Sequence, residues 1–140
     1  GAAIDVDGER PLLATVTGGL SGPAIRPVAV RCIWQVYERL RAPILGMGGV
    51  SSGRDAAELM LAGASAVAVG TAALVDPLAP VRVLGELDEI LAAKGVAAAE
   101  LTGRAHRHAG AGAGAEAGAG SRAGLPGAAC SPAGGDGSRA

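Results

Sequence analysis

Glycine and threonine residues at the ends of two short apolar runs could hold an anionic group. Gly48-Gly49 directly follows the first run, and Gly70-Thr71 directly follows the second. Backbone N–H groups at a helix N-terminus have no intrahelical partner, and glycine lets the chain approach an anion closely. These four residues therefore form a candidate phosphate cradle. The sequence leaves one alternative open, in which the glycines only make tight turns between strands and helices.

The elements that must position this cradle are two strands, each followed by a helix. Residues 44–47 and 65–69 are apolar without polar alternation, which is typical of parallel strands covered on both faces. Ser52 and Asp55 have the spacing of a capping box, which predicts a helix over residues 53–62. This order of elements predicts right-handed βαβ units in a parallel sheet.

Two longer amphipathic helices are predicted on either side of this unit. The first begins at Pro27, because proline suits the first helical position. Its apolar stripe is expected at Ala29, Ile33, Val36 and Leu40. The second is capped by Asp76-Pro77 and ends at Lys94-Gly95. Its apolar face is expected at Val83, Leu84, Leu87, Ile90 and Leu91.

The N-terminal segment is predicted to be a hairpin followed by a glycine-rich loop. Residues 2–6 and 11–16 are short extended candidates around a charged turn at residues 7–10. Residues 17–23 then contain three glycines, including Gly22. This density indicates either a backbone with positive φ or close approach to another group, and an ordinary flexible loop is the alternative.

Composition and charge exclude several classes of protein. The chain has 140 residues and a net charge of −1, and its local basic cluster at residues 104–108 leaves little footprint for nucleic acid. It has no 18-residue apolar run and no leader pattern, so we expect a soluble cytoplasmic protein without membrane segments. Cys32 and Cys130 match no metal or disulfide framework, and Cys32 is expected to be a buried small hydrophobe. Trp34 and Tyr37 are expected to be packing residues.

The chain divides by composition into residues 1–103, which have a globular pattern, and residues 104–140, which do not. The second part consists largely of glycine and alanine, so burial cannot offset the entropy of ordering it, and we expect a disordered tail. His106 and His108 form a pair that could bind a metal ion. Solvated tail residues are the favoured interpretation because no further ligand is evident nearby, and no metal site is assigned.

Three motifs, taken in order, resemble the C-terminal part of dihydroorotate dehydrogenase over residues 1 to about 103. The motifs are Thr17-Gly18-Gly19-Leu20-Ser21-Gly22-Pro23-Ala24-Ile25-Arg26-Pro27, Gly46-Met47-Gly48-Gly49-Val50 and Ala62-Gly63-Ala64-Ser65-Ala66-Val67-Ala68-Val69-Gly70-Thr71-Ala72. The form of the first motif is most similar to the bacterial class that works with an electron-transfer subunit carrying FAD and an iron–sulfur cluster.

The resemblance implies an α/β fold that is the C-terminal portion of a (β/α)₈ TIM barrel. Such a barrel needs about 250 residues, so this chain can supply only part of one. By the same resemblance Gly22 lies beside FMN, while Gly48, Gly49, Gly70 and Thr71 take its phosphate. In this family (S)-dihydroorotate is oxidised to orotate in de novo pyrimidine (UMP) biosynthesis. A base removes a proton from the substrate, and a hydride passes to FMN.

The resemblance also places the family's chemical residues upstream of residue 1. These are a cysteine base, an Asn-Thr pair that contacts orotate and a lysine near the flavin, so no catalytic residue is assigned here and Cys32 is a poor substitute. We therefore expect a C-terminal fragment that alone neither turns over dihydroorotate nor holds FMN tightly, and a homo-oligomer when complete. The alternatives are a flavin barrel like that of dihydropyrimidine dehydrogenase and a noncatalytic fragment whose strand edges need a partner chain.

Overall fold

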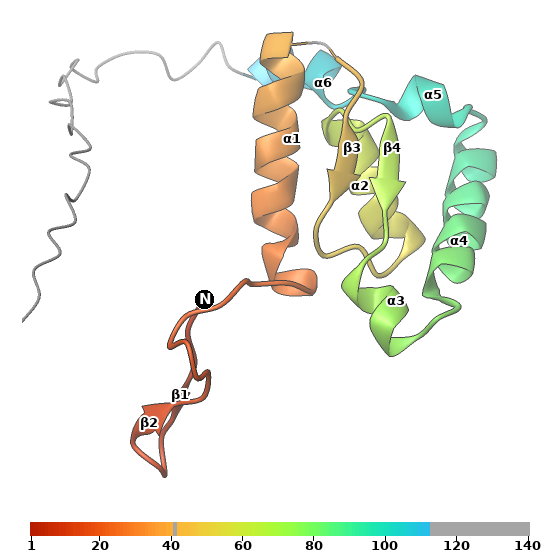
Figure 1. Cartoon of the computed structure of the whole chain (residues 1–140). Coiled ribbons are helices and arrows are strands. Elements are labelled where there is room, and N and C mark those ends of the chain that lie inside the picture. Colours follow the sequence, from red (N-terminus) through yellow and green to blue (C-terminus); the bar gives the residue numbers. More distant parts are fainter. Residues whose placement is uncertain (41, 113–140) are drawn as a thin grey trace, which may run out of the picture.

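Two parallel strands and the helix that joins them form the centre of the protein in the computed structural model, which describes residues 1–40 and 42–112 (Figure 1). Strand β3 (Leu45–Met47) pairs in parallel with β4 (Ala66–Ala68). Helix α2 (Gly53–Ala62) connects them. This arrangement confirms the βαβ unit that the two apolar runs predicted.

Helix α2 is the most buried element because it packs against helices on both sides. Helix α1 (Arg26–Leu40) lies on one side of the strands and α4 (Ala79–Lys94) on the other (Figure 1). Leu59 of α2 is fully buried between them. The main core cluster consists of Ile33, Val50, Ala56, Leu59, Ala62, Ala64 and Val83.

Helix α1 presents a different face to the core from the predicted one. Val36 and Leu40 are 40% and 69% exposed, whereas Trp34 and Tyr37 are half-buried. Ile33 is buried as expected. The face is rotated because both aromatic rings pack against a side chain from the C-terminal segment, which helical periodicity alone does not reveal. Cys32, expected to be buried, is exposed for the same reason.

The N-terminus of α2 confirms the predicted capping box. The Asp55 amide donates to Ser52 Oγ at 3.2 Å, and the Ser52 amide donates to Asp55 Oδ2 at 3.0 Å. The helix stops at Gly63, whose φ of 128° suits glycine. Both helix boundaries were therefore readable from local sequence.

The segment after β4 differs from the prediction. A short helix, α3 (Thr71–Val75), was not expected, and α4 starts at Ala79 instead of at Pro77. Asp76 caps the intervening turn, because its Oδ1 accepts from the Leu78 amide at 3.0 Å. On α4 Val83 is buried, but Leu84 is 58% exposed and does not belong to the apolar face.

The sheet is covered on one face only, which corrects the expectation of two covered faces. Gly46 is buried toward α1 and α2, and a Cβ on it would lie 2.8 Å from the Ala64 Cβ. Leu45 and Met47 point the other way and are 58% and 59% exposed. Within the described residues no element buries Leu45 and Met47 on that second face. The parallel sheet there has only two strands.

The predicted hairpin forms and projects away from the body (Figure 1). Strand β1 (Ile4–Asp5) pairs antiparallel with β2 (Arg10–Pro11), and Arg10 forms an ion pair of 3.5 Å with Asp5. The following loop ends in a 3₁₀ turn, η1 (Pro23–Ile25), that leads directly into α1.

The start of the predicted tail is folded, which corrects the boundary expected after residue 103. Helices α5 (Ala98–Leu101) and α6 (His106–Gly112) follow α4. The His106 ring stacks on Trp34 with centroids 3.5 Å apart, and its Nε2 lies 2.9 Å from the Ala62 carbonyl oxygen. His106 is therefore a packing residue, whereas His108 is exposed.

The remaining predictions for the tail, including Cys130, concern residues 113–140 and lie outside the described residues. Within the described ranges no group of three metal-ligating side chains could hold a metal ion. In the same ranges no helix combines the length and the apolar character needed to cross a bilayer.

Candidate functional site

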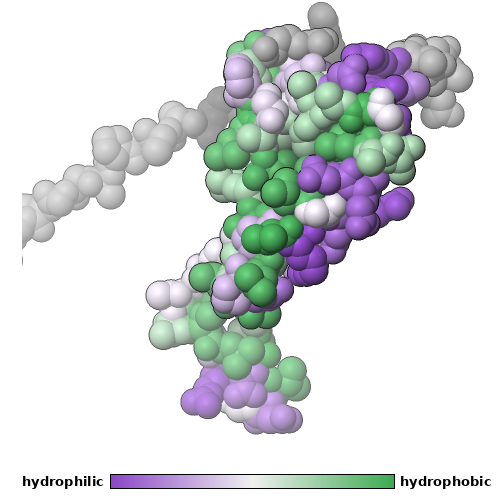
Figure 2. Space-filling view, turned by 90° about the vertical axis from the view of Figure 1, so that its right-hand side faces the viewer, coloured by the Kyte–Doolittle hydropathy of each residue, from purple (hydrophilic) through white to green (hydrophobic). Residues whose placement is uncertain are grey.

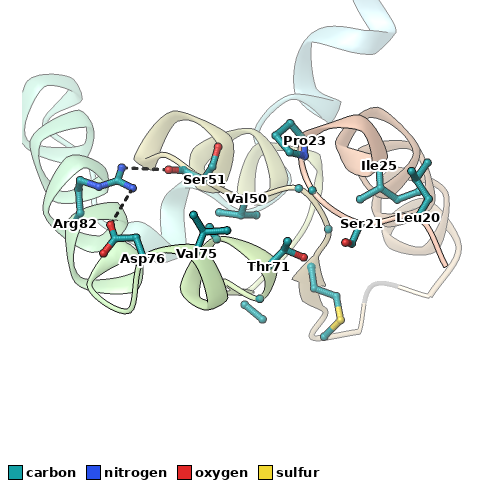
Figure 3. Close-up of a pocket in the computed structure, with 17 residues that line it drawn as sticks. Leu20, Ser21, Pro23, Ile25, Val50, Ser51, Thr71, Val75, Asp76 and Arg82 are labelled. Atoms are coloured by element: carbon teal, nitrogen blue, oxygen red, sulfur yellow. Dashed lines mark hydrogen bonds and ion pairs between the residues drawn. The ribbon is translucent and has the colours of Figure 1, made fainter. Parts of the chain in front are cut away.

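A pocket with a cavity volume of about 580 Å³ lies at the C-terminal ends of β3 and β4 (Figure 3). This volume falls in the range of roughly 300–1,000 Å³ that is typical of small-molecule sites. The structure brings all five predicted site residues to its wall, namely Gly22, Gly48, Gly49, Gly70 and Thr71. Three segments that are far apart in sequence therefore meet where parallel α/β structures bind ligands.

The loop between β3 and α2 needs its glycines for two reasons. Gly48 and Gly49 have φ values of 122° and 73°, which side chains rarely adopt. A Cβ on Gly49 would also lie 2.8 Å from the Arg26 Cβ and 2.9 Å from the Gly22 carbonyl oxygen. The loop is thus pressed against the Gly22 segment. Gly48 and Gly49 therefore do make a tight turn, and this turn is compatible with a binding role.

Two other glycines border open space. A Cβ on Gly22 or Gly70 would meet no atom within 4 Å. Among the described residues, the backbone amides of Gly49, Val50, Gly70 and Thr71 have no protein acceptor. The two walls of the pocket therefore offer unpaired donors beside free space, as an anion site requires.

The N-terminus of α2 does not contribute free donors, contrary to the prediction. The amides of Ser51 and Ser52 both donate to Asp55 Oδ2 at 3.0 Å. The Gly53 amide donates to Glu86 Oε2 at 2.6 Å. The amides of Ser51, Ser52 and Gly53 therefore donate to carboxylates of the protein itself. An anion at this loop would therefore bind to the amides of Gly49 and Val50, which precede Ser51.

Among the described residues, Asp55 is the one charged residue that is buried, with 7% exposure. It accepts from the Ser51 hydroxyl at 2.9 Å, and it is paired with Arg26, which also lies 3.1 Å from Glu58. Burial would raise the pKa of Asp55, but the hydrogen bonds from Ser51 and Ser52 and the charge of Arg26 outweigh it and lower the pKa. The ionised carboxylate joins the start of α1 to the loop that carries Gly49.

A second ionic group, which includes the pocket residues Asp76 and Arg82, lies at one end of the pocket. Arg82 Nη1 donates to the Ser51 carbonyl oxygen and to Glu86 Oε1, each at 3.2 Å, and its Nη2 is 3.7 Å from Asp76 Oδ2. The Gly53 amide, and then Arg82, hold the pKa of Glu86 below its usual range. Sequence reasoning missed this group. Its one local signal was the i, i+4 spacing of Arg82 and Glu86.

The two ends of the pocket differ in polarity. Figure 3 shows Leu20 and Ile25 at one end and Arg82 with Asp76 at the other. Apolar side chains continue along the wall at Val50 and Val75. The pocket therefore combines an apolar end with a polar end, as small-molecule sites commonly do.

Apolar surface extends beyond the pocket over α3 and the start of α4. Leu74, Val75, Leu78 and Val81 are each at least 68% exposed. Viewed from the α4 side, apolar and hydrophilic areas lie next to each other on this face of the molecule (Figure 2).

Comparison with known proteins gives a consistent result. The family model of dihydroorotate dehydrogenase matches residues 1–91. The "Dihydroorotate dehydrogenase B (NAD(+)), catalytic subunit" of Desulforudis audaxviator is 56% identical over 108 residues, which cover 76% of this chain and 35% of that protein. The protein of the same name from Geobacter metallireducens is 53% identical over 96 residues, with 69% and 32% covered.

Solved structures agree with these relatives. The crystal structure of DHODH from Eimeria tenella in complex with ferulenol has a TM-score of 0.63 and 31% sequence identity, and the match covers 76% of this chain and 30% of that one. The chain thus spans about a third of the length of the relatives it matches.

Proposed function

Because the chain belongs to the dihydroorotate dehydrogenase family, we propose that it forms the FMN-phosphate end of a site that oxidises (S)-dihydroorotate to orotate in de novo pyrimidine biosynthesis. The observation that carries this proposal is the convergence of five residues on one pocket, namely Gly22, Gly48, Gly49, Gly70 and Thr71. The family's chemistry requires a flavin, and the pocket has the donors and the free space that a flavin phosphate needs.

In the proposed site, the residues of this chain bind and orient FMN. The amides of Gly49 and Val50 on one wall, and of Gly70 and Thr71 on the other, would hold the phosphate of FMN. Gly22 leaves open space where the ring system would lie, and the apolar wall would shield it from water. FMN, when bound, supplies the hydride acceptor for the oxidation. Proton removal from the substrate is assigned to none of these residues.

The open sheet face supports a larger fold. We propose that the described part is the C-terminal portion of a (β/α)₈ barrel, whose interior would cover Leu45 and Met47. In such a barrel, side chains of successive strand residues alternate between the interior and the surrounding helices. The burial of Gly46 toward α2 and the exposure of its two neighbours fit that alternation.

The proposed assembly includes a second subunit. The bacterial relatives are named catalytic subunits of a B-type, NAD(+) enzyme, which supports a partner that carries electrons away through FAD and an iron–sulfur cluster. We further propose that the catalytic chain forms a homo-oligomer when complete and that the assembly is cytoplasmic.

Titration of the 140-residue chain with FMN and with riboflavin tests the proposal. The two ligands share the ring system, and riboflavin lacks the phosphate. We expect weak binding of FMN, with a dissociation constant about tenfold lower than that of riboflavin, because charge-assisted hydrogen bonds to the phosphate are lost in the latter. Flavin fluorescence measures both constants. Equal affinities, or no binding of either flavin, would contradict the proposal.

A further inference from the structure

We propose that Arg82 is a positioning residue that sets the spacing between the two walls of the pocket, and through it the affinity for the phosphate end of the ligand. One wall is the loop that carries Gly48 and Gly49, and the other is α3 with the preceding Gly70. This inference rests on the proposed function, and it adds a residue that lies outside the glycine motifs.

The contacts of Arg82 connect both walls. Its Nη1 donates to the carbonyl oxygen of Ser51, two residues after Gly49, and its Nη2 faces the carboxylate of Asp76 at the end of α3 (Figure 3). Of the pocket residues that the structure describes, Arg82 is the one whose side chain bonds to both segments. Removal of its guanidinium would leave the two walls without this direct connection.

Glu86 holds the guanidinium in place from the next turn of α4. Its Oε1 accepts from Arg82 Nη1 at 3.2 Å, while its Oε2 accepts from the Gly53 amide at 2.6 Å. Two residues of α4 therefore bind the carbonyl of Ser51 and the amide of Gly53, on either side of the α2 N-cap. The planar guanidinium places its donors on separate nitrogens in a fixed geometry, so Nη1 faces Ser51 and Glu86 while Nη2 faces Asp76. The ammonium of lysine is a point charge on one nitrogen and does not reproduce this geometry.

Direct binding of the phosphate by Arg82 is the competing role, and Asp76 distinguishes the two. Asp76→Asn removes the ionic partner of Arg82 but keeps a side-chain oxygen for the Leu78 amide. If Arg82 bound the phosphate itself, this change would free the guanidinium and remove a negative charge, so FMN would bind more tightly. If Arg82 positions the walls, the loss of one anchor weakens FMN binding.

The test compares Arg82→Lys and Asp76→Asn with wild type in the 140-residue chain, by titration with FMN and with riboflavin. Arg31→Lys, on the exposed side of α1, is the matched control. We expect the dissociation constant for FMN to rise about tenfold in both variants. The dissociation constant for riboflavin should change little, because riboflavin lacks the phosphate. General loosening of the fold would instead weaken the binding of both flavins equally. Unchanged or tighter FMN binding in Asp76→Asn would overturn the proposal.

A second measurement separates this inference from the proposed function. If wild type binds neither flavin, the proposed function fails, and the role of Arg82 is then judged from backbone amide NMR shifts without ligand. Positioning predicts that Arg82→Lys shifts the amides of both walls, around residues 48–51 and 70–72. Shifts confined to α4 and its immediate neighbours would show that Arg82 does not position the walls.

Discussion

At the scale of single residues, glycine decides the shape of the pocket in two distinct ways. Gly49 is needed because its φ is 73° and a Cβ would press on Arg26, so its role in the protein is steric. Gly22 and Gly70 face open space, where a side chain would meet no atom but would occupy the pocket, and at Gly22 it would also be strained by the φ of 78°. The same residue type thus builds the wall at one position and keeps the cavity free at another.

Gly49→Asp should abolish FMN binding, because it places a carboxylate beside the proposed phosphate site and strains a loop of positive φ. Gly49→Asn is the matched control, since it has nearly the same size and no charge. We expect Asn to weaken binding and Asp to remove it, as measured by flavin titration of both variants. If Asp binds FMN as tightly as wild type does, the loop is not the phosphate site.

At the scale of elements, ionic groups fasten the pocket segments to the helices behind them. Asp55 joins α1 to the β3–α2 loop through Arg26 and Ser51, while Arg82 and Glu86 join α4 to the same loop. The loop carries the candidate donors, and its position depends on α1, on α2, which carries Asp55, and on α4. His106 performs a similar task on the far side, where its stacking on Trp34 holds α6 against α1.

Asp55→Asn should lower the free energy of unfolding and make this free energy less dependent on pH under acidic conditions. The pKa of Asp55 is below its ordinary value of 3.8, so its stabilising effect is complete above that value and is lost as the pH falls through and below it. We expect a loss of about 2 kcal/mol at pH 7, because the substitution removes the buried carboxylate that pairs with Arg26 and leaves it only the more exposed Glu58.

Urea denaturation at several pH values checks this expectation. The difference between wild type and Asp55→Asn should stay constant down to about pH 5 and shrink as the pH falls through and below 3.8. Asp88→Asn, on an exposed position of α4, is the control and should leave the curve unchanged. A difference that stays constant over this range would mean that the charge of Asp55 does not stabilise the fold.

At the scale of the whole molecule, the open sheet face is the dominant feature. Leu45 and Met47 are more than half exposed, and each strand of the β3–β4 pair has an unpaired edge within the described chain. Exposed strand edges with apolar faces favour association with other chains. This arrangement also supports the alternative interpretation of the chain as a noncatalytic piece that needs a partner.

The isolated chain should therefore elute above its monomeric size in gel filtration. Leu45→Lys should shift it toward the monomer, because a charge on the open face opposes association, while Val28→Lys on exposed α1 should not. A purified chain that is yellow because it retains FMN would contradict the noncatalytic interpretation. A colourless, aggregated chain would favour it. A monomeric wild type would mean that the open face does not drive association.

Local sequence was sufficient for the features that depend on neighbouring residues. The capping box of Ser52 and Asp55, the stop at Gly63 and the two glycine motifs after the apolar runs all follow from spacings of a few residues. The order of these elements then made the parallel pairing of β3 and β4 predictable.

Tertiary packing alone decided the features that depend on distant residues. The ring of His106 reaches back to Trp34 and sets the buried face of α1, although the composition of residues 104–140 predicted disorder there. Glu86 reaches the Gly53 amide from 33 positions away and satisfies a donor that the sequence left free for an anion. The rotation of a helix about its axis and the partner of a helix-end amide depend on contacts between elements, which periodicity and motif spacing do not encode.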